Sequence, residues 1–419
     1  MTRLRQPHSG FTLIEVMIAM LIGIIGIVVM MQTFAVSEGF KRTATSGTDA
    51  QVNGSVALYM LEREVRTAGY GMNGYLPAIG AAPSNTYCNT VRVWNTAAGT
   101  GRDVRILPVE INPAGIPAGD PNTDVIVVGY GNSDSVVAGV QANQASGVTG
   151  AITVLSSKDG FRNGDLVVSV QPGTPASCVL HELTQTPGAA GSCGSPSAGS
   201  DLIHGVSTYQ TADKSQAMCS TVTPRFNASG GIKDSGGATV PVLNQNTGAQ
   251  VFNLGVPSLK AYAIRGGNLT SCDILYNDCT NAANYTVVVN DIVSLRAVYG
   301  RDTNNPQDFQ VDTWDRAALP NLSDASSVMA LMFEIVARSG VKEKPSTGTA
   351  CDALTDPTRP DKGSTQDWIG GPTSPGIAQG IGIDLSLSAP AGAPPTDWKC
   401  YRYRLYQTRV PIRNMTWRP

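Results

Sequence analysis

The sequence is poor in charge, in histidine and in aromatic residues, and these shortages exclude several classes of function. Only 15% of its 419 residues are charged and the formal net charge is −2, which excludes a strong electrostatic footprint for nucleic acid or for an anionic membrane surface. There are three histidines and no Cys-x-x-Cys pair, so a structural zinc site lacks its usual ligands. We expect no cofactor.

The motifs of common enzymes are also missing. The sequence has no Gly-x-Ser-x-Gly turn and no Gly-x-x-x-x-Gly-Lys-Ser/Thr loop. His181 and Glu182 begin a zinc-protease pattern, but Gln185 stands where its second histidine belongs. Residues 69–74 satisfy Gly-x-Gly-x-x-Gly, yet a helix is predicted before them and strands after them, which is the wrong context for a dinucleotide site. We therefore expect a protein that is not an enzyme.

What the sequence does have is a long apolar run over residues 11–36 with a single charged residue, Glu15, near its start. A bilayer core needs about 20 apolar residues in a helix, so this run can span a membrane. Arg3 and Arg5 precede it, and the positive-inside rule keeps that end in the cytoplasm. A carboxylate at membrane depth is expensive, so Glu15 is a functional residue by default.

Residues 10–15 read Gly-Phe-Thr-Leu-Ile-Glu and, with the apolar run, resemble the class III signal of type IV prepilins. The resemblance implies that prepilin peptidase cuts after Gly10, that Phe11 becomes the N-methylated N-terminus, and that Glu15 registers neighbouring subunits. A Glu15 carboxylate that meets the Phe11 amine of a neighbour would give each buried charge a partner. An ordinary signal peptide has a shorter apolar core before its cleavage site, and a plain signal anchor does not account for this motif.

The predicted fold is α+β, with a long N-terminal pilin helix packed on a β-rich globular domain with large loops. We expect a leader (1–10), a transmembrane assembly helix (11–36), an amphipathic half of the same helix (37–70) and a periplasmic or extracellular domain (71–419). Apolar residues at helical spacing predict the second half, and glycines from residue 69 end it: Leu58, Leu61, Val65 and Ala68.

Strand patterns dominate the rest of the chain. They predict strands at 91–95, 104–111, 124–130, 151–156, 165–171, 251–254, 259–265, 292–299, 328–338 and 400–410. Residues 187–200 and 227–248 are rich in small and polar residues and predict loops, and residues 342–397 carry little strand signal.

Several short segments, scattered over the rest of the chain, resemble PilW-type minor pilins in particular. These minor pilins are related to the J-type pseudopilins of type II secretion. The segments are residues 64–71, 252–255, 262, 267–269, 293–300 and 410–415. This resemblance implies a low-abundance subunit that helps to initiate a pilus. Its partners would be other minor pilins, the major pilin, prepilin peptidase, the inner-membrane assembly platform and, before assembly, membrane lipid. It would leave the inner membrane for the pilus fibre or tip.

All eight cysteines lie beyond the apolar run, where an oxidising compartment favours disulfides. Eight cysteines allow 105 pairings, so only proximity in sequence is available as a guide. It favours Cys272–Cys279 and Cys351–Cys400, which leaves Cys88, Cys178, Cys193 and Cys219 to pair among themselves in an order that stays open.

Two further groups of residues have competing interpretations. Asp302, Asn304, Asp308 and Asp312 form an acidic loop that is a weak candidate for calcium, although a solvated turn explains it better. Residues 401–406 alternate Tyr or Leu with Arg, as nucleic-acid grooves can, but a half-buried strand with a polar outer face is the better explanation.

Three functions remain open from the sequence. The first is a minor pilin in pilus assembly, and the second is a binding module at the pilus tip, either an adhesin or a DNA receptor. The third is a J-type pseudopilin of type II secretion, which shares every feature described above.

Overall fold

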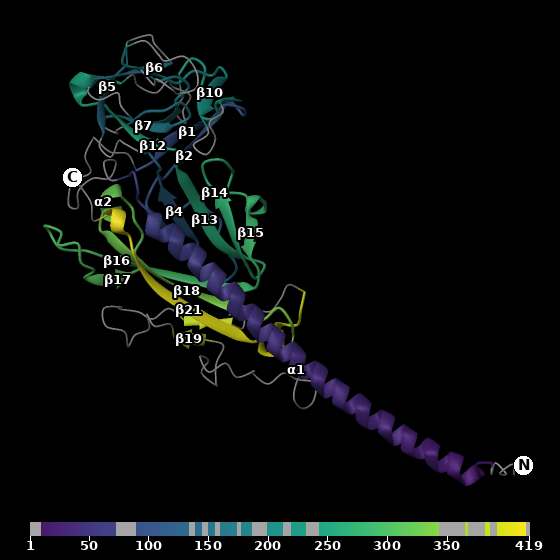
Figure 1. The fold of residues 1–419 in the computed structure, drawn as a ribbon. Helices are drawn as coiled ribbons and strands as arrows, with labels where there is room; N and C mark the ends of the chain where they lie inside the picture. The colour runs from purple at the N-terminus through teal and green to yellow at the C-terminus, as the bar shows by residue number, and fades with distance from the viewer. Residues whose placement is uncertain are drawn as a thin grey trace, which may run out of the picture.

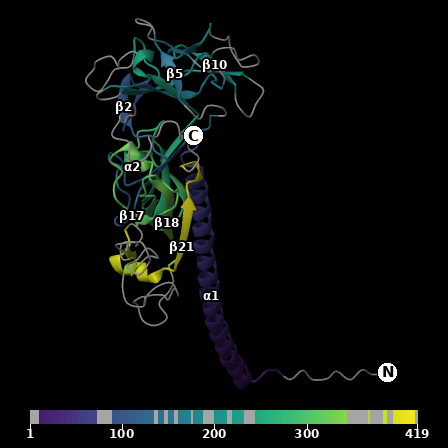
Figure 2. The same cartoon turned by 90° about the vertical axis from the view of Figure 1, so that its left-hand side faces the viewer.

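In the computed structural model, a single long helix carries a group of β-sheets at one end (Figure 1). The structure describes residues 10–72, 89–133, 139–144, 150–155, 160–173, 177–186, 199–212, 219–231, 243–342, 365–367, 382–385 and 392–415. The helix, α1 (Leu13–Thr67), has 55 residues. Its N-terminal half projects away from the sheets and its C-terminal half lies against them (Figures 1 and 2). The α+β fold predicted from the sequence is confirmed.

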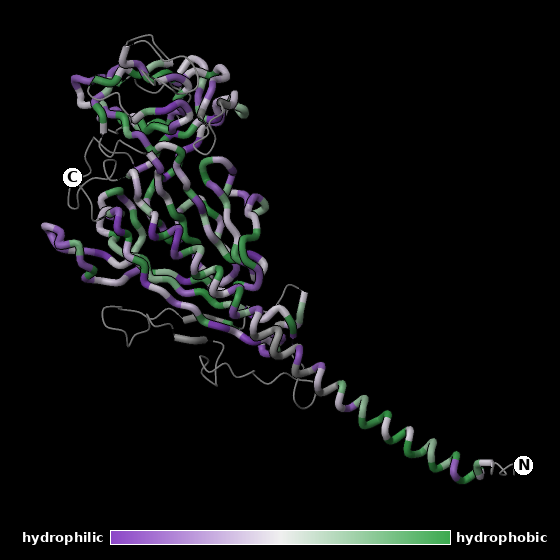
Figure 3. The backbone as a smooth tube through the Cα atoms, in the orientation of Figure 1, coloured by the Kyte–Doolittle hydropathy of each residue, from purple (hydrophilic) through white to green (hydrophobic). Residues whose placement is uncertain are grey.

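The two halves of α1 differ in composition and in burial. Leu13–Phe34 is long and apolar enough to cross a membrane, and none of it is buried by the rest of the chain. Figure 3 shows this projecting half as mostly hydrophobic. The other half is amphipathic, and the side chains that it buries recur at helical spacing: Ala50, Ala57, Leu61, Val65 and Ala68.

The end of α1 is fixed by glycines and by bonds to a strand. Gly69 and Gly71 follow the helix with φ of +77° and +72°, which only glycine adopts readily. The Gly69 N–H donates to the carbonyl of Gly129, and the Gly131 N–H donates to the carbonyl of Tyr70. The glycine-rich segment is therefore a helix-terminating turn tied to the neighbouring sheet.

Two antiparallel sheets lie against the C-terminal half of α1 (Figure 1). The five-stranded sheet has the order β15 (Thr286–Val289), β14 (Asn268–Asp273), β13 (Ser258–Arg265), β4 (Ile126–Tyr130) and β3 (Val109–Ile111). The four-stranded sheet has the order β17 (Thr313–Asp315), β16 (Ile292–Arg301), β18 (Val328–Arg338) and β21 (Tyr403–Pro411). A short helix, α2 (Leu322–Ala325), precedes β18.

A third sheet forms what we call the distal lobe, together with the hairpin β10 (Tyr209–Ala212) and β11 (Cys219–Val222). Figures 1 and 2 show it at the end of the molecule opposite the N-terminus. The order of its eight strands is β2 (Thr100–Val104), β1 (Val91–Asn95), β8 (Ser177–Glu182), β7 (Leu166–Gln171), β12 (Gln250–Gly255), β5 (Val140–Asn143), β6 (Ala151–Val154) and β9 (Asp201–Ile203).

The distal lobe is largely an insertion between two paired strands. β4 and β13 are neighbours in the five-stranded sheet, yet β5 to β12 lie between them in sequence. The eight-stranded sheet of the distal lobe contributes buried side chains to two different hydrophobic cores. Val168 and Leu180 belong to the main core beneath α1, whereas Val167 and Leu183 belong to a separate core within the lobe.

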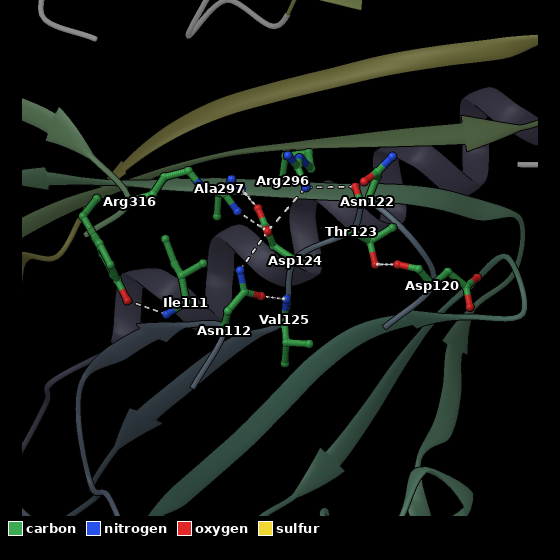
Figure 4. A network of polar contacts seen from close by, with 11 residues as sticks. Ile111, Asn112, Asp120, Asn122, Thr123, Asp124, Val125, Arg296, Ala297 and Arg316 are labelled. Carbon is green, nitrogen blue, oxygen red and sulfur yellow. Dashed lines mark hydrogen bonds and ion pairs between the residues drawn. The ribbon is translucent and has the colours of Figure 1, made fainter. Parts of the chain in front are cut away.

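A buried carboxylate joins the five-stranded and four-stranded sheets (Figure 4). Asp124 is 1% exposed and lies just before β4. It accepts hydrogen bonds from Asn112 Nδ2 and from the backbone N–H of Ala297, each at 2.9 Å. Arg316 and Arg296 form ion pairs with it. A buried charge with this many partners is fully compensated, and it holds the two sheets in register.

All ten predicted strands overlap strands of the structure, but about as many others were not predicted, among them β5, β8, β14 and β15. Two further differences concern residues 104–111 and 342–397. Residues 104–111, predicted as one strand, divide between β2 and β3 because residues 105–108 turn from the distal lobe into the five-stranded sheet. Residues 342–397, with little strand signal, contain the short pair β19 (Thr365–Asp367) and β20 (Gly382–Asp384). Short 3-10 helices lie at Gln245–Thr247, Ala282–Asn284, Pro395–Cys400 and Arg413–Met415.

Two buried histidines face each other in the distal lobe. The ring centroids of His181 and His204 are 4.3 Å apart, and Ser169 Oγ lies 2.8 Å from His181 Nε2. Burial lowers the pKa of His204 to about 4. Burial and the neighbouring His204 also lower the pKa of His181 well below its usual 6.5. Both rings are therefore neutral in the folded chain.

This pair makes the distal lobe sensitive to acid. Below the usual histidine pKa of 6.5 the unfolded chain binds protons that the folded chain excludes, so stability falls as pH drops from 6.5 towards 4. The loss is about 1.4 kcal/mol per pH unit for each histidine. We predict that urea unfolding of His181→Gln/His204→Gln depends less steeply on pH in this window than unfolding of the parent.

The comparison between variant and parent is the test, because other groups titrate too. Burial raises the pKa of Glu334 to about 8. Its effect on stability is opposite to that of the histidines, because the folded state loses stability as pH rises from 4.5 towards 8. Equal pH slopes for the parent and the double variant would contradict this account of the histidine pair.

A second prediction concerns the contact between α1 and β21. Gly54 is buried, and a Cβ added there would lie 2.0 Å from Tyr406 Cε2. The Tyr406 hydroxyl donates to the carbonyl of Gln51 at 3.0 Å, which holds the ring over the helix. We predict that Gly54→Ala destabilises the fold by about 1 kcal/mol, because overpacking of 1–3 kcal/mol exceeds the gain of about 1 kcal/mol in helix propensity.

Thermal or urea unfolding measures this effect, and the exposed neighbour Ser55→Ala is the matched control. Ser55→Ala should leave stability unchanged or raise it slightly. In a Tyr406→Leu background the Gly54→Ala penalty should disappear, since the overlapping ring is gone. A stabilising Gly54→Ala in the parent chain would show that the close approach does not hold the helix.

Candidate functional site

The strongest candidate site is the N-terminal segment, residues 10–15, where α1 begins. Gly10 and Phe11 precede the helix and are exposed, with Phe11 88% exposed. Thr12 is the N-cap residue, with extended φ and ψ of −76° and 151°. The bond that a peptidase would cut, between Gly10 and Phe11, is therefore accessible and outside the helix.

Thr12 and Glu15 form a capping box. The Glu15 N–H donates to Thr12 Oγ1 at 3.4 Å. In return Glu15 Oε2 accepts from the Thr12 N–H at 3.0 Å and from the Thr12 hydroxyl at 2.9 Å. Such a box satisfies backbone N–H groups that the first helical turn leaves without partners. A carboxylate in the first turn is also favoured by the positive end of the helix dipole.

This geometry leaves one oxygen of Glu15 available. In the described part of the chain Oε1 accepts no hydrogen bond, whereas Oε2 is engaged in the cap. An amine on a neighbouring chain can therefore bind Oε1 while the cap stays intact. A role of Glu15 between subunits is predicted from the sequence, but the cap is not, although Thr-x-x-Glu before an apolar run is the usual signature of a capping box.

The helix that carries Glu15 is exposed on all sides along its apolar part. Leu13–Phe34 has no buried residue in the isolated chain. Lipid or other apolar helices can cover such a surface, and water does so only at high cost. A helix of this kind, with one carboxylate at its start, can anchor the chain in a membrane and present that carboxylate to neighbouring helices.

The structure contains the predicted disulfide between Cys272 and Cys279, with a Cα–Cα distance of 5.9 Å. It closes the loop that follows β14, and both cysteines are buried. Cys178 and Cys400 are also disulfide-bonded. Cys88, Cys193, Cys351 and the side chain of Cys219 lie outside the described residues, so Cys351–Cys400 and the remaining pairings stay predictions.

The weak calcium candidate is a hydrogen-bonded loop. Asp302 accepts from the backbone N–H groups of Asn304 and Phe309, and Asp312 accepts from the N–H of Thr303. Asn304 Nδ2 donates to Asp312, and Asp308 accepts from the Gln310 N–H. These carboxylates bind the turn of their own loop. No group of three or more His, Cys, Asp or Glu side chains suited to a metal occurs among the described residues.

The C-terminal Tyr-Arg alternation leads into a half-buried strand, β21, which begins at Tyr403, so the predicted strand is confirmed from that residue on. Tyr401 and Tyr403 are buried in a small core with Trp398, whereas Arg404 is exposed. Tyr403 donates its hydroxyl to the carbonyl of Trp398. The tyrosines are therefore core residues and do not form a stacking platform.

Comparisons with known proteins place the N-terminal segment in a wider context. A family profile described as "Prokaryotic N-terminal methylation motif" matches residues 5–31, which include Gly10, Phe11 and Glu15. No curated protein and no solved structure matches the chain. The methylation motif, the accessible Gly10–Phe11 bond and the exposed apolar helix together support a protein of the type IV pilin or pseudopilin type, and they are consistent with anchoring in a membrane.

Proposed function

We propose that this chain is a minor pilin of the PilW type that takes part in initiating a type IV pilus. Prepilin peptidase removes residues 1–10, Phe11 becomes the methylated N-terminus, and α1 passes from the inner membrane into the fibre. The domain that begins at residue 71 then lies outside the inner membrane. The role is structural rather than catalytic, and the observation that carries it is Glu15 at the head of an uncovered apolar helix.

The chemistry of joining follows from the capping box. In this proposal Glu15 keeps Oε2 on its own Thr12 and binds the Phe11 amine of the neighbouring subunit through Oε1. Each charge then has a partner in a medium where an unpaired charge is expensive. Because the bond joins fixed points on two parallel helices, it also sets their axial offset. The neighbours are other minor pilins, the major pilin or the inner-membrane assembly platform.

The position of the distal lobe supports the proposal that this chain is a low-copy subunit near the end of the fibre. It lies at the end of the molecule opposite the N-terminus of α1 (Figures 1 and 2). If the subunits of a fibre stack with their helices parallel, a lobe in this position occupies space that the next subunit along the axis would need. A chain of this shape fits best where no further subunit follows.

A J-type pseudopilin of type II secretion is the second candidate, because it would share the same N-terminal motif and the same helix. The genes beside this one distinguish the two systems, since pilus and secretion genes are grouped separately. A binding function at the tip is compatible with either, and it concerns the distal lobe rather than α1.

The role of Glu15 can be tested with two substitutions that separate capping from charge. Glu15→Gln keeps a side chain that capping boxes accept at this position but removes the charge, whereas Glu15→Val removes both. We predict that both variants are inserted and cleaved normally, and that both are largely lost from sheared fibres. The measurement is immunoblotting of the fibre fraction alongside the membrane fraction.

Asp49→Asn is the matched control, since it removes an exposed carboxylate from the same helix outside the apolar part. It should enter fibres normally. If Glu15→Gln enters fibres as well as the parent does while Glu15→Val does not, the residue acts through the helix cap, worth about 1 kcal/mol, and not through a charge pair.

A further inference from the structure

A pocket opens where the distal lobe meets the five-stranded sheet, far from the N-terminal segment. It lies between the β1–β2 hairpin, the segment that follows β11, and the loop that follows β14. Its volume is about 760 Å³, within the range of small-molecule sites. Nothing in the assembly role of α1 uses this pocket.

Many of the residues that line the pocket are apolar or aromatic. Val93, Phe226 and Leu275 line it and are almost completely buried. Trp94 and Tyr276 also line it, and Tyr276 is 38% exposed. These rings give a ligand large and partly exposed faces on which to stack.

The side chain of Arg225 lies over one of these rings and has no carboxylate partner among the described residues. The guanidinium carbon of Arg225 lies 5.3 Å from the ring centroid of Tyr276. Within the described part of the chain its side chain has no ion pair and no hydrogen bond, and its residue is exposed. Among the described residues that line the pocket there is no Asp or Glu, whereas the hydroxyl residues Thr221 and Thr223 are present.

Two charged side chains beside the pocket, Arg102 and Glu182, form hydrogen bonds to the backbone of its walls. Arg102 donates to the carbonyls of Ile274, Leu275 and Asn277, which fixes the loop that carries Tyr276. Glu182 accepts from the backbone N–H groups of Arg225 and Phe226, at 2.6 and 3.3 Å. Both sides of the pocket are thus pre-organised, and Arg225 is the cation left for a ligand.

We propose that this pocket binds a carboxylated sugar. The apolar face of a sugar ring can stack on Trp94 or Tyr276, its hydroxyls can bond to the threonines, and its carboxylate matches the fork of the Arg225 guanidinium. Nucleic acid fits less well, because its phosphate backbone is bound by several cations and the pocket offers one that is unpaired. The proposal is independent of the pilin assignment, since it rests on the distal lobe and the neighbouring loop after β14 and not on α1.

The test uses the full-length chain in detergent and two matched pairs of probes. Sialyllactose and digalacturonate carry carboxylates, while the methyl ester of sialyllactose and the dimethyl ester of digalacturonate are their neutral counterparts. Titration calorimetry or ligand-observed NMR should show saturable binding of at least one acidic sugar, tighter than binding of its neutral counterpart. Glutarate, a dicarboxylate without sugar rings, should bind more weakly than the acidic sugars.

Three substitutions locate the binding. Arg225→Gln should weaken acidic-sugar binding about tenfold or more and erase the preference over the neutral sugar, because it removes a charged hydrogen bond. Trp94→Ala should weaken acidic and neutral sugars alike. Arg404→Gln, an exposed arginine on β21 outside the pocket, should change neither. An unchanged circular dichroism spectrum confirms that each variant is folded.

The proposal is overturned if neither acidic sugar shows saturable binding to the parent chain. It is also overturned if Arg225→Gln binds them as tightly as the parent, or if glutarate binds as well as the sugars.

Discussion

The structure depends first on the need to cover the apolar half of α1. Leu13–Phe34 forms a helix that nothing in its own chain covers. Burial of one large aliphatic side chain is worth about 1.5–3 kcal/mol, so exposing a surface of this length to water is costly. Lipid or other apolar helices can provide the cover, which is consistent with anchoring in a membrane. Glu15 is the one charged residue in this segment, and its position in the first turn gives it both a cap and an oxygen that accepts no hydrogen bond among the described residues.

The rest of the fold holds this helix at a defined orientation to the sheets. α1 buries a stripe of mostly small residues against the sheets, and Gly54 brings its backbone close to Tyr406 of β21. Asn414, just after β21, donates to the carbonyls of Thr67 and Ala68 at the end of α1. The helix is thus held at two places by the C-terminal part of the chain, so that force on the helix would be transmitted to the four-stranded sheet.

Local patterns in the sequence predict the helix and about half of the described strands, including the four longest, β13, β16, β18 and β21. The run to Val36 and the spacing from Leu58 to Ala68 predict α1 within a few residues, and the apolar run at 328–338 predicts β18. Cys272 and Cys279 were predicted as a pair because a short loop brings them together, and the structure has that bond. In each case the determining contacts lie close in sequence.

The features that could not be predicted from the sequence depend on contacts between residues that lie far apart in the chain. The distal lobe requires β4 and β13 to pair across an insertion of more than a hundred residues, and β1 to pair in parallel with β8. No periodicity encodes such pairings. Asp124 reads as a polar residue before a strand, and its partners Arg296 and Arg316 are far away in sequence. The pocket around Arg225 likewise joins three separate segments.

The proposed role of α1 in assembly depends most on cleavage of the bond between Gly10 and Phe11. Mass spectrometry of the N-terminal peptide from the native protein measures this directly. The account predicts a chain that begins at Phe11 and carries one added methyl group on its amine. A native chain that retains residues 1–10, or one cut near Ser37 after the apolar run, would contradict it, because the helix would then lack either the free amine or the membrane-spanning part on which joining depends.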